Sequence, residues 1–356
     1  MKEKKKITRR QFLKGAVAGV AGLTAIGIFG PMVMPGRRGG SGAGADTPIG
    51  ATNPVPTNAF DFTKHTVLLN NGIEMPIFGL GTFQLTPEQA ANSAYWALRA
   101  GYRLIDTAAA YSNEDGVGQG IKRAIDEGIV TREEIFLTTK LWPMGGYNMT
   151  SIDNALETLG LDYIDLLLLH QPMGDYIEGY QAMEEAVRQG KVRSIGISNF
   201  SASQMEEIMD IATIPPAVQQ VETHLHHQQG SMMEYLNIYG TVLESWFPLG
   251  GRGNTSTFFN LAEVQEIANA HDKTPPQVII RWHLQSGHVC IPGSTNEAHI
   301  QENIGAYDFE LTEEEMARLN ALEKNEPFFR GMGGSEEETR EMLEGWEERW
   351  NLDVVE

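Results

Sequence analysis

Asp165-Leu166-Leu167-Leu168-Leu169-His170 is the stretch of sequence that says most about the fold. Its four leucines leave no polar face, and a strand of this kind is typical of a parallel sheet buried on both sides. The run ends on a histidine, so it delivers a polar side chain at its carboxyl end. The stretch therefore predicts a buried parallel strand in an α/β protein.

Similar apolar runs and helical segments alternate along the chain. Eight strand–helix units in roughly 250 residues predict a (β/α)8 TIM barrel, and a doubly wound sheet is the alternative. Gly79-Leu80-Gly81 is a poor dinucleotide fingerprint, because Gln84 stands where the third glycine belongs. The expected strands are 77–81, 103–106, 135–139, 165–169, 193–197, 218–221, 241–245 and 288–291. The expected helices are 86–99, 116–127, 151–159, 177–189, 202–211, 231–238, 258–285 and 296–303.

Features outside the repeating units complete the domain organisation. Asn71-Gly72 between two short apolar segments predicts an N-terminal β-hairpin. Ser335 and Glu338 have the spacing of a capping box, which favours a helix over 336–350 in an atypical C-terminal tail. The expected divisions are a signal and cleavage region at 1–45, a linker at 46–63, the barrel at 64–325 and the tail at 326–356.

The composition excludes some classes of protein. The 356 residues include 27 Lys and Arg against 47 Asp and Glu, a net charge of −20, so the nucleic-acid backbone would repel the chain. One cysteine, Cys290, excludes an intrachain disulfide framework and thiolate zinc sites. We therefore expect a globular protein that binds no nucleic acid.

The N-terminus departs from this acidic average. Residues 1–45 contribute a charge of +8, which leaves −28 on the remainder. Arg9-Arg10 is followed by Phe12-Leu13-Lys14 and a short apolar run over 15–30, which resembles a twin-arginine signal. The resemblance implies the twin-arginine export machinery as a partner and a periplasmic or cell-surface location. Ala43-Gly44-Ala45 fits a cleavage site. An uncleaved signal that anchors the chain to the membrane is the alternative.

Four polar residues follow the predicted strands on what would be one rim of the barrel, where active groups of such barrels lie. They are Asp106, Tyr111, Lys140 and His170. A phenol can give a proton to a developing alkoxide if a neighbouring cation tunes it. Lys140 can be that cation with Asp106 as its ion-pair partner, and His170 can orient a carbonyl. This set suits carbonyl reduction with a hydride from a nicotinamide cofactor.

Several blocks of sequence resemble the aldo-keto reductase family. They are Gly101-Tyr102-Arg103-Leu104-Ile105-Asp106-Thr107-Ala108-Ala109-Ala110-Tyr111, residues 137–142, 165–172 and 190–200, in that order. The resemblance implies NAD(P)H-dependent reduction of an aldehyde or ketone to an alcohol, with Asp106, Tyr111, Lys140 and His170 as the catalytic residues. A non-catalytic barrel that binds a nucleotide or small carbonyl ligand is the alternative function.

The same resemblance implies the cofactor and substrate contacts. Trp246 matches the aromatic residue that stacks on the nicotinamide, and Ser198, Asn199 and Gln220 match the residues that hold its carboxamide. Phe83 and Trp142 match the lining of the substrate pocket. Further implied cofactor residues are Gly81, Thr82, Phe83, Asp106, Leu249, Ser294, His299, Glu302 and Asn303.

Two departures from the family pattern concern the cofactor's phosphate. Gly293 stands where the family has Lys, and His299 where it has Arg, the two cations that hold the 2′-phosphate of NADP. The loss of two charge-assisted contacts weakens that grip. NADP(H) is expected from the resemblance, and we hypothesise that NAD(H) is accepted as well.

Three histidines, His224, His226 and His227, crowd one predicted loop. A metal site is conceivable there, but no carboxylate stands at a spacing that would complete it. His224 also matches a position that is usual in the family. We therefore expect no metal.

Overall fold

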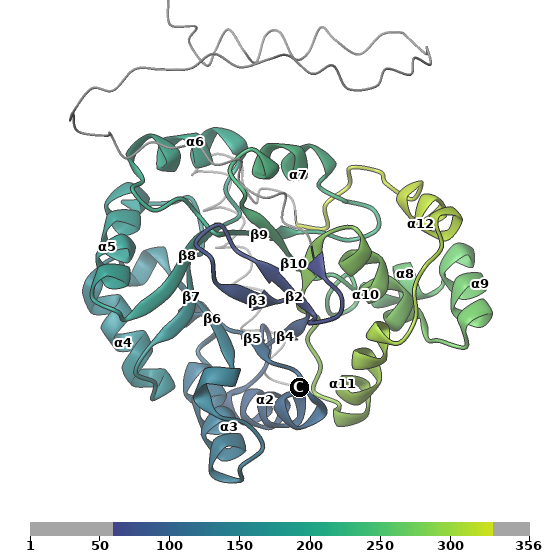
Figure 1. Cartoon of the computed structure of the whole chain (residues 1–356), viewed down its shortest axis with the longest axis horizontal. Helices are drawn as coiled ribbons and strands as arrows, with labels where there is room; N and C mark the ends of the chain where they lie inside the picture. The colour runs from purple at the N-terminus through teal and green to yellow at the C-terminus, as the bar shows by residue number, and fades with distance from the viewer. Residues whose placement is uncertain (1–59, 330–356) are drawn as a thin grey trace, which may run out of the picture. The chain divides into compact units, whose positions relative to one another are not determined.

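The computed structural model describes residues 60–329, and these form an eight-stranded parallel sheet that curls into a barrel with helices around it (Figure 1). The predictions for 1–45 and for the helix at 336–350 lie outside the described residues. The barrel strands are β4 (Gly79–Gly81), β5 (Leu104–Asp106), β6 (Phe136–Leu141), β7 (Ile164–Leu169), β8 (Val192–Ser198), β9 (Val218–Glu222), β10 (Val242–Trp246) and β11 (His288–Cys290).

The strands pair in chain order, and the barrel closes between its first and last strands. Leu168 of β7 lies opposite Lys140 of β6 and Gly196 of β8. At the seam, the backbone N–H of Cys290 donates to the carbonyl of Ile77 at 3.0 Å. Phe78 and Cys290 form a parallel bridge there. The predicted (β/α)8 barrel is therefore confirmed, and the doubly wound alternative is wrong.

The helices begin and end at recognisable signals. Thr86 and Gln89 form a capping box at the start of α2, and Gly101 ends this helix with a φ of 106°. The helices are α2 (Pro87–Ala100), α3 (Glu114–Asp126), α4 (Met149–Leu159), α5 (Tyr176–Arg188), α6 (Ala202–Ile211), α7 (Gly230–Asn237), α8 (Thr255–Phe259), α9 (Ala262–His271), α10 (Pro275–Gln285), α11 (Glu297–Asn303) and α12 (Glu313–Asn320). Short 3₁₀ helices are η1 (Ala109–Tyr111), η2 (Arg132–Glu134), η3 (Pro143–Gly145) and η4 (Ile304–Tyr307).

The single helix expected over 258–285 is wrong. The structure has α8, α9 and α10 in its place. Asp272 adopts a left-handed φ of 53°, which ends α9. Pro275 and Pro276 then start α10, because a proline has no N–H to continue the preceding helix.

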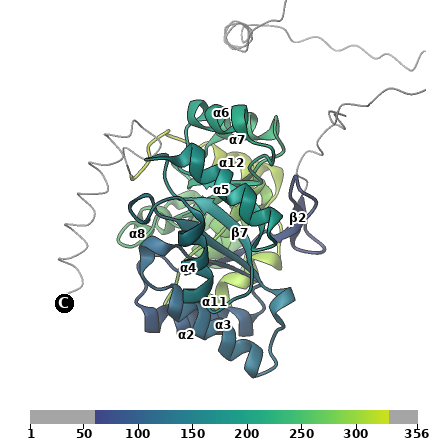
Figure 2. The same ribbon diagram turned by 90° about the vertical axis from the view of Figure 1, so that its left-hand side faces the viewer.

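The predicted hairpin is confirmed as β2 (Thr66–Leu68) and β3 (Glu74–Pro76), which pair antiparallel with Val67 opposite Met75. β1 (Phe60–Asp61) adds a third strand from residues that we expected in the linker. Figure 2 shows β2 at one end of the barrel, and the opposite end carries α8. The hairpin thus covers the amino-terminal end of the strands and leaves the carboxyl end for a site.

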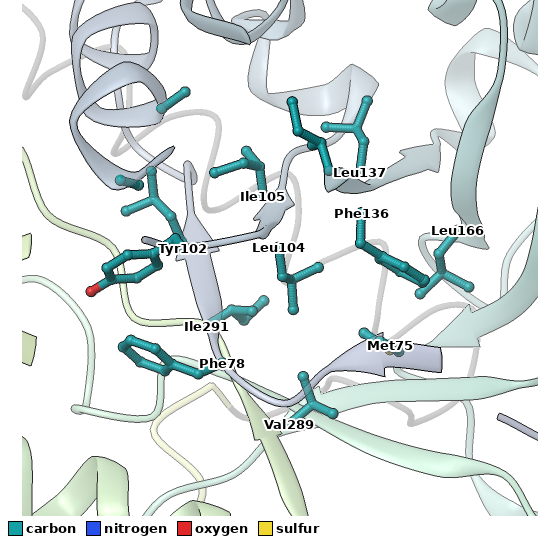
Figure 3. Packing of buried hydrophobic residues seen from close by; sticks show 14 of the residues in the cluster. Met75, Phe78, Tyr102, Leu104, Ile105, Phe136, Leu137, Leu166, Val289 and Ile291 are labelled. Atoms are coloured by element: carbon teal, nitrogen blue, oxygen red, sulfur yellow. The ribbon is translucent and has the colours of Figure 1, made fainter. Parts of the chain in front are cut away.

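The core fills the barrel interior and the space between the strands and the helices. Leu104, Leu166 and Val289 are completely buried and come from three different strands (Figure 3). Met75 of the hairpin is also completely buried and belongs to the same cluster, so the hairpin seals this end of the core. Burial of a side chain of this size contributes about 1.5–3 kcal/mol. The barrel is therefore a packed scaffold for its carboxyl-terminal rim.

Candidate active site

Neighbouring strands carry the polar residues of the carboxyl-terminal rim. Asp106 is the last residue of β5, and His170 directly follows β7. Lys140 is the fifth residue of β6, whereas we expected it just after that strand. Tyr111 lies in η1 after β5. The structure brings these four side chains together.

The centre of the site is the ammonium group of Lys140. Its Nζ donates to both carboxylate oxygens of Asp106 at 2.7 Å and to the carbonyl of Thr107 at 2.9 Å. It also lies 3.2 Å from the phenol oxygen of Tyr111. These four oxygens belong to three residues and share the three hydrogens of a charged lysine.

Burial and neighbouring charges shift the pKa values of these side chains in opposite directions. Burial raises the pKa of Tyr111 to about 12, although the charge of Lys140 works in the other direction. Burial also raises the pKa of Asp106, and Lys140 opposes it. For Lys140, burial lowers the pKa, but Asp106 and Tyr111 outweigh it, so the net shift is upward. Tyr111 is therefore a neutral phenol beside a permanent cation.

His170 completes the rim as a neutral imidazole. Burial and the nearby Lys140 hold its pKa well below the ordinary value. Its ring meets Tyr111 and Trp142 edge-on, with ring centroids 5.6 Å and 5.0 Å apart. Its Nδ1 is buried and has no hydrogen-bond partner among the described residues. A neutral imidazole beside a phenol is suited to orienting a carbonyl group between them.

The residues expected to hold an amide-bearing ring lie in or just after β8, β9 and β10. Asn199 lies just after β8 with a left-handed φ of 64°, and its Nδ2 donates to the carbonyl of His170 at 3.1 Å and to the hydroxyl of Ser198 at 3.1 Å. The indole Nε1 of Trp246 donates to Asn199 Oδ1 at 2.9 Å, which fixes the ring. Gln220 lies one strand away, buried in β9.

Gly81, Thr82 and Phe83 end β4 and begin its loop. The Thr82 hydroxyl donates to the carbonyl of Asp106 at 2.9 Å, so this completely buried residue ties β4 to β5. Phe83 is half-buried, and its ring centroid lies 4.8 Å from that of Tyr111. Phe83 therefore faces the site, whereas the Thr82 side chain is used within the scaffold.

An aromatic group extends from Phe83 to the last described residue. Phe247 lies 5.4 Å from Phe83 and 5.0 Å from Phe329, measured between ring centroids. Phe329 lies 5.4 Å from Trp246. Leu249 packs against the core nearby, half-buried. The C-terminal segment thus contributes a ring to the mouth of the site.

The phosphate and adenine candidates lie at and after the end of β11. His299 is exposed on α11, and Asn303 is buried at the end of the same helix. Glu302 accepts a hydrogen bond from Thr274 at 2.6 Å. Ser294 accepts one from the backbone of Asn296 at 3.1 Å. Gly293 is exposed, but a Cβ there would lie only 2.9 Å from the carbonyl of Gly81, so a side chain at this position needs the backbone to shift.

Sequence reasoning missed three buried polar residues around the site. Asn113 ties the loops after β4 and β5 together through the carbonyls of Thr82 and Leu85 at 2.9 Å. Glu222 accepts the backbone N–H of Phe328 at 2.6 Å. Glu244 lies inside the barrel on β10. An acidic residue inside a buried strand is the signal that could have identified Glu244.

The histidines at 224, 226 and 227 were considered as metal ligands, and two of them contact side chains of the barrel instead. His224 Nε2 lies 3.0 Å from Glu222, and the rings of His224 and His226 lie about 5 Å from that of Phe258. Within residues 60–329, no three His, Cys, Asp or Glu side chains form a metal-binding group. None of the helices in this range has the length and hydropathy of a membrane span.

A parallel (β/α)8 barrel with a buried Asp–Lys pair beside a tyrosine at its carboxyl-terminal rim defines a barrel enzyme. Comparison with known proteins gives the family. A model of the aldo/keto reductase family matches residues 77–324. The chain therefore belongs to the aldo/keto reductase family, and it is an oxidoreductase.

Individual relatives are similar over most of their own length. Glyoxal reductase of Bacillus subtilis is 44% identical, over 74% of this chain and 94% of the relative. The NAD(P)H-dependent D-xylose reductase I,II of Candida tropicalis is 36% identical, over 73% of this chain and 93% of the relative. The crystal structure of a Bombyx mori aldo-keto reductase in complex with NADP superposes with a TM-score of 0.70 at 36% identity, covering 73% of this chain and 93% of that one.

Proposed function

We propose that the protein reduces an aldehyde or ketone to an alcohol with NAD(P)H, and that Tyr111 gives the proton. The observation that carries the proposal is the 3.2 Å contact between the Lys140 ammonium and the Tyr111 phenol, backed by the Asp106 carboxylate. As the carbonyl oxygen becomes an alkoxide, the phenol gives up its proton to it. Lys140 then stabilises the phenolate that remains.

The neutral state of His170 suits this reaction. A neutral imidazole has one N–H, and that hydrogen can bond to the carbonyl oxygen of the substrate. Trp142 packs edge-on against His170 and limits its rotation. His170 therefore orients the carbonyl toward Tyr111 without competing with it as an acid.

The donor set fits a nicotinamide. Asn199 and Ser198 place amide and hydroxyl groups beside Trp246, and its indole is held at 2.9 Å by Asn199. A flat aromatic face next to amide-binding groups suits a ring that bears a carboxamide. When bound, the reduced nicotinamide supplies the hydride. Two relatives whose names include NADP or NAD(P)H support the proposal that this chain uses a nicotinamide cofactor.

Aromatic rings dominate the mouth of the site and favour apolar carbonyl substrates. Phe83, Trp142, Phe247 and Phe329 surround Tyr111 or adjoin its neighbours. Aromatic pairs add about 0.5–1.5 kcal/mol beyond simple burial. We propose that an aryl aldehyde is turned over with a higher kcat/KM than a polyhydroxy aldehyde of similar size.

The test is the loss of NADPH or NADH absorbance with a panel of aldehydes and ketones, including benzaldehyde, glyoxal and xylose. We expect turnover of benzaldehyde. Cofactor binding without turnover of any panel member would favour the non-catalytic alternative. Turnover of xylose in preference to benzaldehyde would contradict the proposed substrate class.

We also propose that the chain is exported through the twin-arginine route with its cofactor bound. Arg9-Arg10 and the Phe12-Leu13-Lys14 that follows support the route, which carries folded proteins. Free nicotinamide cofactors are not expected outside the cytoplasm, so the cofactor must travel with the enzyme.

The export proposal is tested by fractionating cells that produce the full chain. We expect the wild type in the exported fraction with nucleotide bound, and the Arg9→Lys/Arg10→Lys double variant in the cytoplasm. A double variant exported as efficiently as the wild type would contradict the route. Exported protein without nucleotide would contradict co-transport of the cofactor.

A further inference from the structure

Glu244 is an acidic residue in the barrel interior next to the catalytic candidates. It lies in the middle of β10 and is completely buried. Its neighbours on the strand, Leu243 and Ser245, are buried as well. A carboxyl group in such a place needs partners, because burial of an isolated charge is costly.

A single amide connects Glu244 to Asp106. Gln220 Nε2 donates to Asp106 Oδ2 and to Glu244 Oε2, both at 2.8 Å. Since both neighbours are carboxyl oxygens, the amide must present its nitrogen to them. Its two hydrogens are then used, and the amide oxygen is the part of Gln220 left for a ligand. Gln220 thereby holds the two carboxyl groups beside each other.

The charges in this group do not balance if both acids are ionised. Lys140 is the cation that pairs with Asp106, through both oxygens. Within residues 60–329, Glu244 receives one hydrogen bond, from Gln220, and its buried Oε1 has no partner. With Glu244 protonated, Asp106 and Lys140 form a neutral pair. With Glu244 ionised, the interior carries an uncompensated negative charge.

The electrostatics of the surrounding groups agree with a protonated Glu244. Burial raises the pKa of Glu244 to about 8, and the charge of Asp106 adds to this, while Gln220 and Lys140 oppose it. The titratable groups that face it are Asp106 on β5, Tyr111 on η1, Lys140 on β6 and Cys290 on β11. Burial raises the pKa of the Cys290 thiol well above its ordinary value, so this thiol stays neutral.

We propose that Glu244 is a positioning residue for the carbonyl reduction proposed above: protonated, it keeps the Asp106–Lys140 pair balanced and holds Gln220 against Asp106. It acts through these side chains and touches no substrate. Its ionisation adds a negative charge near Tyr111, which raises the pKa of that phenol. A phenol with a higher pKa is a weaker acid, so reduction slows when Glu244 loses its proton.

The first test is the pH profile of kcat/KM for reduction by the full chain and by Glu244→Gln. Glutamine keeps an oxygen for Gln220 and cannot ionise. We expect the wild-type value to fall roughly three- to tenfold between about pH 7 and pH 9, with an inflection near pH 8, and Glu244→Gln to lack that inflection. The same inflection in Glu244→Gln would overturn the proposal.

Glu114 provides the matched control. It is a second buried acid near Lys140, and burial raises its pKa to about 6. Its Oε1 accepts a hydrogen bond from Thr139 at 2.6 Å. Glu114→Gln should therefore keep the inflection near pH 8. Loss of that inflection in Glu114→Gln would assign it to Glu114 and overturn the proposal.

Infrared spectroscopy gives a readout that needs no turnover. We expect the wild type without substrate to show the C=O band of a protonated carboxyl above neutral pH, which disappears as pH passes about 8. Glu244→Gln should lack this band, and the wild type can contradict the proposal even if that variant does not fold. Absence of the band would overturn the proposal. If the wild type shows this band but reduces no carbonyl compound, then the protonation of Glu244 is correct and the proposed function is wrong.

Discussion

The ammonium nitrogen of Lys140 lies 2.7 Å from each carboxylate oxygen of Asp106, and both side chains are almost completely buried. A buried ion pair adds little net stability by itself, because desolvation of the two charges offsets their attraction. Removal of one partner is a different matter, since it leaves the other charge buried and unpaired. The pair therefore has a mutational signature that separates it from a surface salt bridge.

Asp106→Asn should lower the free energy of unfolding by about 3–5 kcal/mol because it strands the Lys140 charge. Adding Lys140→Met should restore part of this stability, since the double variant has no buried charge at the pair. Urea denaturation at neutral pH measures both effects. Additive losses in the double variant would contradict a coupled pair.

Tyr111→Phe should lower kcat by about 10²- to 10⁴-fold, the range that general acid catalysis contributes. The phenol oxygen touches Lys140 and is the proton source in the proposed reaction. The affinity for NADPH, measured by fluorescence titration, should stay within a factor of about two, because the variant keeps the ring. An unchanged kcat would exclude Tyr111 as the rate-determining proton donor.

His299→Arg should strengthen NADPH binding by about 10- to 100-fold and leave NADH binding nearly unchanged, because a charged hydrogen bond to the phosphate contributes about 1.5–3 kcal/mol. His299 is exposed on α11, so the change should not disturb the fold. Parallel titrations with NADPH and NADH measure it. Gln301→Arg, at another exposed position on the same helix, is the control. Equal gains from His299→Arg and Gln301→Arg would indicate a general charge effect.

Glu222→Gln should loosen the C-terminal segment. The Glu222 carboxylate accepts the backbone N–H groups of Phe328 and Phe329 at 2.6 Å and 3.3 Å, and charged acceptors form the stronger hydrogen bonds. Limited chymotrypsin digestion should cut after these phenylalanines faster in the variant, and KM for an aryl aldehyde should rise. Glu326→Gln, at an exposed position of the same segment, should behave like the wild type. Digestion at equal rates in both variants would contradict a tether by Glu222.

His288→Gln should reduce the sensitivity of the fold to acid. Burial lowers the pKa of His288 to about 4, whereas the ordinary value is 6.5. The unfolded chain therefore takes up a proton first, and stability falls as pH drops from about 6.5 to about 4. The shift corresponds to a loss of about 3 kcal/mol over that window. Denaturation midpoints across this range should change less in the variant, and an unchanged pH dependence would contradict the assignment.

The alternation of strands and helices was predictable because it depends on neighbouring residues. The leucines of 165–169 form β7 as expected, and Thr86-Pro87 starts α2. The helix boundaries within 258–285 were missed because the apolar pattern continues across Pro275. The division between α9 and α10 depends on Asp272, whose left-handed backbone conformation is not encoded by hydrophobic periodicity.

The polar residues of the site were predictable only in part. Asp106 ends β5, Lys140 is the last but one residue of β6 and His170 follows β7, so their common rim follows from the barrel alone. Glu222 and Glu244 lie in strands as well, but nothing in the local sequence shows that one binds the backbone of Phe328 and the other faces Asp106. Phe328 is 106 positions from Glu222, and Gln220, which links Glu244 to Asp106, is 24 positions from Glu244.

The sequence by itself determined the parallel barrel and the identity of the four rim residues, because strand burial and strand ends are local properties. The tertiary structure decided how these residues are joined. Gln220 and Asp106 are 114 positions apart, and their 2.8 Å contact depends on the direction in which β5, β9 and β10 turn their side chains into the barrel. Closure of the barrel sets those directions, so the link between Asp106 and Glu244 exists only in the folded chain.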